Sequence, residues 1–478
     1  MRAASQTSLV IVLLFLAGCG RPESGTSNGD GGSSCVRCVD MDQTVRDGSN
    51  GDPDDATPAN NGVVDTGEPG DDLGAPGEDA ADESDACSVA CTPATDWPIQ
   101  QVRAGRHHTC ALMDDGATYC WGQGAFRALG GDYNFQGTPR LIEAFGDALA
   151  IGAGTKFGCA IRPGGEVWCW GESDHAQVGG NQTIPCGDCT PIPACATSIC
   201  VPTPQPMAGL EAGIVELGLG RAHGCALRDD GRVLCWGDNA SGQVGVDAVM
   251  GDAVAPELVA EVTGATQITA GIDHSCALVG SPGTVMCWGR NDRAQVGNGE
   301  VSDAVRVPAS VAALSDAVEI VGGGSHTCAR RADGTIVCWG YNYLGALGNG
   351  STRPTRATSI QNVVGIDDAV ALAAGQYFTC ALRSTGAVSC WGDNRHGQLG
   401  DGTAAGENCA DRPCRTTPVD VLVVDDVATI TGGELHACAA SRSGTLWCWG
   451  YNLGGQLGTG GVDSDPTPVP VEVQGLPD

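Results

Sequence analysis

The chain has 478 residues, of which 57 are acidic and 25 are basic, so its formal net charge is −32. Its only lysine is Lys156. Nucleic acids and anionic lipid surfaces bind to basic proteins, so this charge disfavours both as partners. We therefore expect no nucleic-acid partner.

The N-terminus is typical of an exported protein. Arg2 precedes an apolar run from Leu9 to Ala17, which is too short to span a bilayer, and the letters LAGC follow at its end, closing on Cys19. This segment resembles a bacterial lipoprotein signal peptide. The resemblance implies that residues 1–18 are removed and that Cys19 becomes a lipidated first residue, which would be the only membrane contact. A plain secretory signal with an incidental cysteine is the alternative.

Residues 19–95 have the composition of a tether. Residues 20–95 contain 17 acidic and 3 basic side chains and almost no large apolar ones. Such a segment cannot bury enough apolar surface to fold, so we expect a disordered acidic linker. Residues 60–72 carry closely spaced oxygen ligands for calcium, but they lack the fixed glycine and final glutamate of the twelve-residue calcium loop. Whether this linker binds calcium stays open.

From residue 96 onward, one β-hairpin pattern occurs seven times. Cys110 and Cys120 are equidistant from Asp115, and Gly116 stands third in the three-residue loop between them, where a positive φ favours glycine. This spacing sets the two cysteines opposite each other on paired strands, within reach of a disulfide. The same pattern predicts hairpin disulfides at Cys110 and Cys120, Cys159 and Cys169, Cys225 and Cys235, Cys276 and Cys287, Cys328 and Cys338, Cys380 and Cys390, and Cys438 and Cys448.

Each hairpin ends in Trp-Gly, and these tryptophans are separated by 49, 66, 52, 51, 52 and 58 residues. A repeat of about 50 residues, with four short extended runs and glycine-rich turns, predicts an all-β fold. We expect residues 96–478 to form a seven-bladed β-propeller of four-stranded blades. A β-helix is the structural alternative, although its coils are normally shorter.

The repeat unit resembles that of the regulator of chromosome condensation family. The copies "AGIDHSCAL", "CWGDNRHGQLGDG" and "CWGYNLGGQLGTG" carry this resemblance, which covers residues 97 to 478. It implies a seven-bladed propeller but no single activity: the eukaryotic namesake is a nucleotide-exchange factor, and secreted bacterial relatives include a protein inhibitor of β-lactamase. The cysteine pairs depart from the commoner family pattern and indicate a chain adapted to life outside the cytoplasm.

The remaining cysteines also fall into local groups of even size. Cys35 and Cys38 form one group and Cys87 and Cys91 another, and two insertions after the Gly-Gln-Leu-Gly-like turns of the second and sixth repeats carry the others. Local disulfides are favoured there over a zinc site, since the spacings do not match a zinc ribbon and exported thiols oxidise. Equivalent positions of different blades emerge on one face, so both insertions are candidate binding loops, or else tolerated surface insertions. Their cysteines are Cys186, Cys189, Cys195, Cys200, Cys409 and Cys414.

Three repeated positions invite a functional interpretation, and we interpret each as structural. Histidine precedes the first hairpin cysteine by two residues in five repeats, but phenylalanine stands there in two, which favours packing over a metal ring. The Trp-Gly tryptophans are expected to fill space between sheets rather than stack on carbohydrate. The asparagines of the "WGxN" segments are expected to bond their own turns.

No catalytic residues, metal site or cofactor site stand out in the sequence. We therefore predict a monomeric, lipid-anchored propeller that binds an unknown protein partner at the cell envelope or surface. The alternative is an enzyme with a site in the central channel, and a nucleotide-exchange factor is supported by family analogy only.

The lipid anchor gives a first prediction. Replacing Cys19 with serine should release the protein from the membrane fraction or block its maturation, because a serine cannot carry the thioether-linked lipid. Membrane fractionation and intact-mass measurement of the mature chain test this. Unchanged retention and mass in the Cys19→Ser variant would contradict it.

Overall fold

A computed structural model describes residues 38–39, 90–91, 97–131, 135–179, 183–186, 198–249 and 251–477. The expected lipidation site at Cys19, most of the expected tether and the calcium candidate at 60–72 lie outside these residues. The chain divides into two units, Met1–Pro93 and Ala94–Asp478. In the first unit, β1 (Cys38–Val39) pairs with β2 (Ala90–Cys91) in an antiparallel register that sets Cys38 opposite Cys91.

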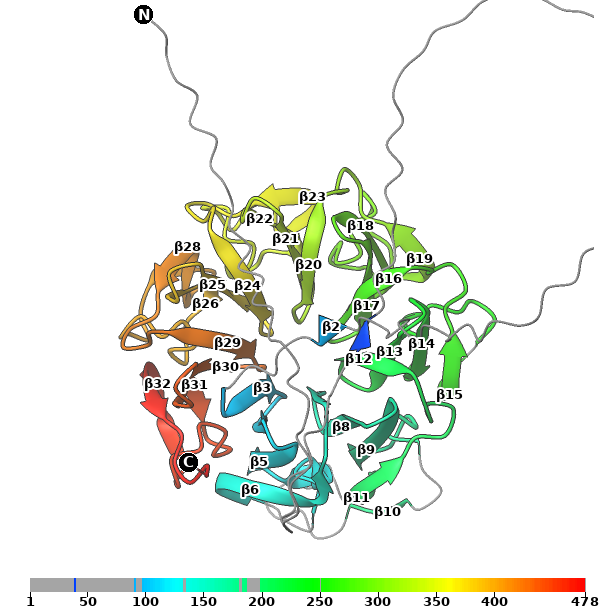
Figure 1. Cartoon of the computed structure of the whole chain (residues 1–478). Helices are drawn as coiled ribbons and strands as arrows, with labels where there is room; N and C mark the ends of the chain where they lie inside the picture. Colours follow the sequence, from blue (N-terminus) through cyan, green and yellow to red (C-terminus); the bar gives the residue numbers. More distant parts are fainter. Residues whose placement is uncertain are drawn as a thin grey trace, which may run out of the picture. The chain divides into compact units, whose positions relative to one another are not determined.

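The second unit is the predicted seven-bladed β-propeller (Figure 1). Blade 1 contains β3 (Ile99–Ala104), β4 (His108–Met113), β5 (Ala117–Gln123) and β6 (Phe135–Gly146), with a short 3-10 helix, η1 (Ala125–Arg127), after β5. Blade 2 contains β7 (Ala150–Ala153), β8 (Phe157–Arg162), β9 (Glu166–Glu172) and β11 (Ile199–Pro206), and a fifth strand, β10 (Ile184–Pro185), pairs with β11.

Blades 3 to 5 follow the same order from the inner to the outer strand. Blade 3 has β12 (Ile214–Leu219), β13 (His223–Arg228), β14 (Val233–Gly237) and β15 (Ala253–Leu258). Blade 4 has β16 (Ala265–Ala270), β17 (His274–Gly280), β18 (Gly283–Arg290) and β19 (Ala304–Ser310). Blade 5 has β20 (Ala317–Gly322), β21 (His326–Arg331), β22 (Ile336–Tyr341) and β23 (Arg356–Asn362).

Blades 6 and 7 complete the ring. Blade 6 has β24 (Ala369–Ala374), β25 (Phe378–Arg383), β26 (Val388–Asp393) and β28 (Arg412–Asp420), with an added strand, β27 (Glu407–Cys409), that pairs with β28. Blade 7 has β29 (Val427–Gly432), β30 (His436–Ser441), β31 (Leu446–Asn452) and β32 (Asp463–Glu472). Among the described residues, no helix is long and apolar enough to cross a membrane.

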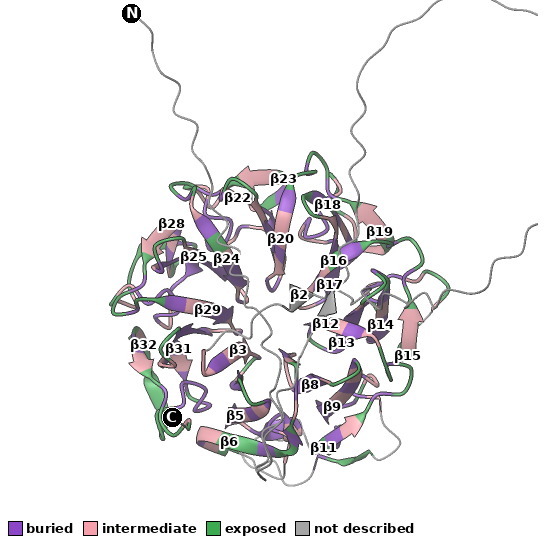
Figure 2. Ribbon diagram, in the orientation of Figure 1, coloured by how far each residue is buried: buried purple, intermediate pink, exposed green. Residues whose placement is uncertain are grey.

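The ring closes by packing rather than by a shared sheet. Each blade consists of consecutive strands, so blade 7 contains no strand from the start of the propeller. Side chains of blade 1 and blade 7 instead form one apolar cluster that includes Ile99, Val102, Trp121, Leu446 and Leu457. The other six blade boundaries carry equivalent clusters, so the core is divided into seven segments that lie between blades. Figure 2 shows buried segments in the strands of every blade.

The seven hairpin disulfides are all present. Cys225 and Cys235 are direct cross-strand partners of β13 and β14, and the six other pairs occupy the same register. The Cα atoms of each pair are 4.0–4.1 Å apart. Gly116 has φ +86°, as the three-residue loop requires. The cross-strand register and the seven disulfides predicted from the cysteine spacing are therefore confirmed.

Removing one hairpin disulfide should destabilise the propeller without unfolding it. The double variant Cys328→Ala/Cys338→Ala frees a loop of about eleven residues, and the chain-entropy model gives a loss of about 2–3 kcal/mol in the free energy of unfolding. Guanidinium unfolding of the oxidised proteins measures this difference. Wild type in reductant should lose more, because all its disulfides open, whereas an unchanged midpoint for the double variant would show that this disulfide stabilises nothing.

Candidate functional site

One hydrogen bond recurs at every blade boundary. The indole Nε1 of the Trp-Gly tryptophan donates to a main-chain carbonyl in the Gly-Gln-Leu-Gly-like turn of the preceding blade, at 2.8–3.0 Å in all seven cases. The tryptophans themselves are at most 1% exposed. Their acceptors are the carbonyls of Gln456, Ala128, Gln177, Gln243, Gln295, Ala346 and Gln398. The packing interpretation of these tryptophans therefore agrees with their contacts.

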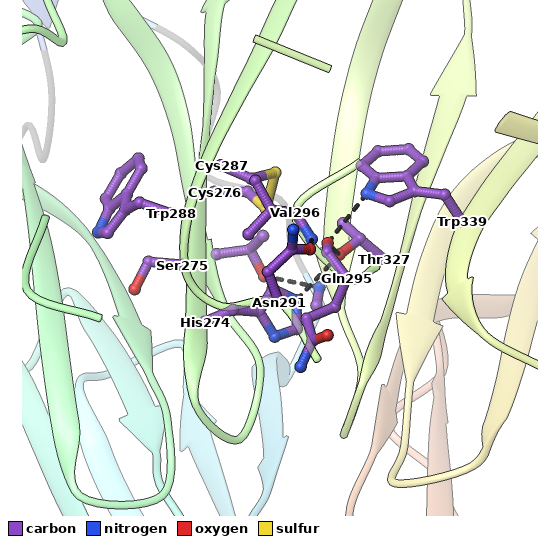
Figure 3. The surroundings of a disulfide bond; sticks show 12 residues. His274, Ser275, Cys276, Cys287, Trp288, Asn291, Gln295, Val296, Thr327 and Trp339 are labelled. Carbon is purple, nitrogen blue, oxygen red and sulfur yellow. Dashed lines mark hydrogen bonds between the residues drawn. A yellow bond between two sulfur atoms is a disulfide. The ribbon is translucent and has the colours of Figure 1, made fainter. Parts of the chain in front are cut away.

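The repeated histidines lie at the same boundaries, as Figure 3 shows for His274. Its Nε2 lies 2.9 Å from Thr327 Oγ1 in the next blade, and that hydroxyl donates to the carbonyl of Gln295 at 3.1 Å. Because the single hydroxyl proton goes to the carbonyl, Nε2 must donate. The imidazole is therefore the neutral Nε2–H tautomer. The same pair joins His223 to Ser275, His326 to Thr379 and His436 to Thr109.

The identity of this residue follows the residue that faces it across the boundary. Phe157 faces blade 3, where the hydroxyl position is Gly224, and Phe378 faces blade 7, where it is Ala437. Histidine thus stands where the next blade offers a hydroxyl, and phenylalanine stands where it offers none. His108 is the exception, because blade 2 has Gly158 at that position and the buried Nε2 of His108 has no partner.

Burial keeps these imidazoles neutral. It lowers the pKa to about 4 for His108, His223 and His326 and to about 3 for His274 and His436. The folded-state pKa lies below the unfolded value of about 6.5, so the unfolded chain binds more protons in this window. The stability linked to these groups is complete above about pH 6.5 and is lost as the pH falls toward their folded pKa values.

The asparagines of the "WGxN" segments hold the turns that supply the acceptor carbonyls. Asn291 Oδ1 accepts from the main-chain N–H of Val296 at 3.1 Å, and its Nδ2 donates to the carbonyl of Glu300 at 3.1 Å. The asparagines of blades 3, 5, 6 and 7 accept the equivalent N–H. Blade 1 has Gly124 at this position and blade 2 has Ser173, so this brace is missing from the first two blades.

One face of the ring carries most of the tyrosines of the chain. We call it the loop face: it consists of the turns between the first and second strands and between the third and fourth strands of each blade. These two sets of turns meet through main-chain bonds such as Gln123 N–H to the carbonyl of His107, at 2.7 Å. Four of the six tyrosines of the chain lie in these turns or at the ends of the strands that lead into them: Tyr341, Tyr343, Tyr377 and Tyr451.

Three of these tyrosines form a cluster with an arginine. The rings of Tyr341 and Tyr343 are stacked with centroids 5.6 Å apart, and the ring of Tyr377 meets Tyr341 edge-on at 6.1 Å. The guanidinium of Arg293, from the neighbouring blade, lies 4.3 Å from the centroid of Tyr341. We call these four residues the tyrosine cluster. All four are partly exposed, so their rings and the guanidinium are available to solvent.

The described disulfides of both predicted binding-loop insertions pack on this face. The Cys186–Cys200 disulfide packs against Phe126 of blade 1, and the Cys409–Cys414 disulfide packs against Leu344 of blade 5. Phe126 and Leu344 occupy the same repeat position, five residues after the Trp-Gly tryptophan. The two disulfides thus pack at equivalent places on one face. Cys189 and Cys195 lie outside the described residues.

Comparison with known proteins now identifies the family. The sequence profile of the RCC1-like domain matches residues 61–371 and 196–478. The chain belongs to the RCC1-like family. Similar curated proteins include the probable E3 ubiquitin-protein ligase HERC6 of Homo sapiens (31% identical over 252 residues, 52% of this chain and 24% of the relative) and the ultraviolet-B receptor UVR8 of Arabidopsis thaliana (30% over 280 residues, 56% and 61%). This chain therefore covers less than two thirds of either relative.

Solved structures show the same fold. The structure of Kap60 bound to yeast RCC1 (Prp20) matches with a TM-score of 0.65 and 22% identity, covering 76% of this chain and 84% of the other. Human WBSCR16 matches with a TM-score of 0.63 and 21% identity, covering 75% and 94%. At these identities the likeness concerns the fold alone.

The centre of this RCC1-like ring contains a narrow channel. Its cavity has a volume of about 90 Å³ and is lined mainly by glycine and alanine, with Arg106, Gln376 and Glu434 among its few polar side chains. Glu434 and Arg106 pair at 2.8 Å. Small-molecule sites usually have about 300–1,000 Å³. The volume of the channel is below this range.

Two groups of potential metal ligands occur among the described residues. In one group Cys409 and Cys414 are joined in a disulfide, so their sulfur atoms are not free to ligate. The other combines His175, Asp238 and Asp252, and His175 Nδ1 already lies 3.2 Å from the carboxylate of Asp252. We assign no metal to either group.

The tyrosine cluster is the feature of the loop face that the sequence analysis missed. Its signal was nonetheless present, because Tyr341 is the variable residue of a "WGxN" segment and Tyr377 directly precedes the packing residue Phe378. Both positions are variable in the repeat and therefore free to differ between blades. Aromatic residues at the variable positions of neighbouring repeats would have pointed to this surface.

The histidines give a paired prediction. His326→Phe removes a buried hydrogen bond to Thr379 and should lower the free energy of unfolding by about 1 kcal/mol. His108→Phe removes no such bond and should cost less, because phenylalanine already fills this position in blades 2 and 6. Chemical unfolding at pH 7 measures the difference.

The pH dependence of the same variants provides a second readout. Between pH 6.5 and 5, each buried neutral histidine contributes up to about 1.4 kcal/mol per pH unit to the loss of stability. Both phenylalanine variants should therefore show a shallower loss than wild type. Equal costs at pH 7 and unchanged slopes would refute the proposed roles.

Proposed function

We propose that this protein is a monomeric lipoprotein of the bacterial cell envelope or surface whose RCC1-like propeller binds a protein partner through its loop face. The observation that carries the proposal is the tyrosine cluster beside a disulfide-closed insertion, on the same face as a second such insertion. The propeller provides the rigid support, and the linker between Cys19 and residue 95 would connect it to the lipid anchor.

The chemistry of the loop face supports protein recognition. Tyrosine and arginine are enriched in protein interfaces and carry most of the binding energy where they are held rigidly. Tyr343 and Tyr377 pack against the buried Cys409–Cys414 disulfide, and Tyr343 stacks on Tyr341. These contacts limit the rotamers of the rings before binding, which lowers the entropy that docking would cost.

The nine described disulfides support export. Seven staple the blades and two close the insertions. So many disulfides persist only in an oxidising compartment such as the cell envelope or the exterior. Export also separates the chain from cytoplasmic GTPases, so nucleotide exchange is disfavoured for this member of the family.

Structures of related propellers are consistent with protein binding as a use of this fold. Yeast RCC1 (Prp20) has been solved bound to Kap60, and the Prp20p of Saccharomyces cerevisiae has been studied for its binding to Gsp1p and histones. For the present chain only the mode of action is proposed, a rigid propeller that presents loops to a protein. Its partner would be a protein of the envelope or exterior.

Affinity capture from envelope extract tests the proposal. The wild-type chain should enrich a partner, and the double variant Arg293→Ala/Tyr343→Ala should bind it at least about tenfold more weakly, because each anchor residue contributes about 2 kcal/mol or more. Point variants are preferable to loop deletions, since shortening either insertion would uncover Phe126 or Leu344.

A variant on the opposite face provides the control. Arg232 follows the β13–β14 turn and its side chain is 57% exposed. Arg232→Ala should leave both binding and thermal stability unchanged. If Arg232→Ala abolishes capture while the double variant retains it, the partner binds the other face and the proposed surface is wrong.

A further inference from the structure

A second hollow, which shares Arg106 and Thr155 with the lining of the channel, lies at the boundary between blades 1 and 2. Its volume is about 270 Å³, close to the lower end of the range for small-molecule sites. Blade 1 lines it from two turns, and blade 2 from the turn between β7 and β8. The lining residues are Arg106, His107, His108, Gln123, Ala125, Phe126, Ala128, Thr155 and Lys156.

The hollow lies where the repeat pattern is broken. At four other boundaries the histidine Nε2 bonds a hydroxyl of the next blade, but here Gly158 offers none. In the same blade, Gly124 and Ala128 replace the usual asparagine and glutamine of the third turn. Single changes of this kind occur at other boundaries, at Ser173, Gly224 and Ala346, but the boundary between blades 1 and 2 combines all three.

Two buried imidazole nitrogens in this lining have no hydrogen-bond partner. His108 is 1% exposed and its Nε2 has no partner among the described residues, whereas in the four bonded histidines the unpaired nitrogen is Nδ1. His107 Nδ1 is also buried and unpaired. Arg106 Nε donates to His107 Nε2 at 3.1 Å, so in the neutral imidazole Nδ1 carries the proton. His107 Nδ1 is therefore a donor that needs an acceptor, and His108 Nε2 can donate to a ligand in the Nε2–H tautomer.

The charges of the lining have one sign. Lys156 and Arg106 are its ionised side chains, and no carboxylate is among the described residues that line the hollow. Their partners, Glu172 and Glu434, pair with them at 2.8 Å from outside the lining. Each cation is thus already paired, but the lining itself offers cationic donors and no carboxylate, which favours an anionic ligand over a metal cation.

We propose that this hollow binds a small anion that carries a carboxylate or phosphate group. His108 Nε2–H, His107 Nδ1–H and the Lys156 ammonium supply donors, and Phe126, Ala125 and Ala128 form an apolar wall for the rest of the ligand. The Lys156 ammonium lies 3.7 Å from the centroid of the Phe126 ring, so the charge and the apolar wall are adjacent. The Cys186–Cys200 disulfide packs behind Phe126 and fixes that wall.

The experiment uses the full chain without a partner and two probes, inorganic phosphate and benzoate, at constant ionic strength with chloride as the reference anion. Calorimetry measures affinity, and imidazole ¹⁵N spectra report the His108 Nε2 resonance. We expect saturable binding of at least one probe with a shift of that resonance. Binding of phosphate alone or benzoate alone decides between the two anion classes.

Matched variants locate the site. His108→Phe and Lys156→Gln should each weaken binding about tenfold or more, while Lys156→Arg should retain it because the charge remains. His326→Phe, which changes the equivalent histidine at a filled boundary, should bind like wild type. The absence of saturable binding at millimolar concentrations, or binding that persists in both His108→Phe and Lys156→Gln, would overturn the proposal.

Discussion

The hydrogen bond from each buried tryptophan to a carbonyl of the preceding blade is the constraint on which the propeller depends. A tryptophan indole N–H that is buried without an acceptor is costly, so each blade needs the turn of its neighbour in place. Trp121 of blade 1 donates to the carbonyl of Gln456 in blade 7, so a hydrogen bond closes the ring although blades 7 and 1 share no sheet. The same need explains why a Trp-Gly pair and a Gly-Gln-Leu-Gly-like turn occur in every repeat at a fixed separation.

The disulfides hold the donor of this tryptophan hydrogen bond in place, and the asparagines hold its acceptor. The disulfide before the tryptophan, as at Cys287 and Trp288, fixes the hairpin from which the indole projects. The asparagine after it holds the turn whose carbonyl accepts from the following blade, as Asn291 does for Gln295 and Trp339. Each repeat therefore presents a donor on one side and an acceptor on the other. A stable fold then follows from repetition, without a large central core.

The sequence predicted the features that are local to one repeat. The Cys–Gly–Cys spacing gave the hairpin register and its disulfides, and the repeat length gave the blades. The tyrosine cluster and the anion-site hollow were not predicted, because each depends on residues from neighbouring blades about 50 positions apart. Arg293 reaches Tyr341 across one boundary, and the role of His108 depends on Gly158 across another. The sequence of a single repeat contains only one residue of each of these two pairs.

Comparison with the other blade boundaries supports a ligand site at the boundary between blades 1 and 2. Where a hydroxyl is missing opposite blades 2 and 6, the chain carries Phe157 and Phe378, so an apolar ring is an available solution for a boundary without a hydrogen bond. At blade 1 the chain instead has His108, whose Nε2 has no partner among the described residues, and its only lysine lines the same hollow. An unpaired buried donor costs stability unless something outside the fold accepts from it. That cost is offset if His108 Nε2 meets a bound anion, and this is why the break in the pattern points to a ligand rather than to a packing defect.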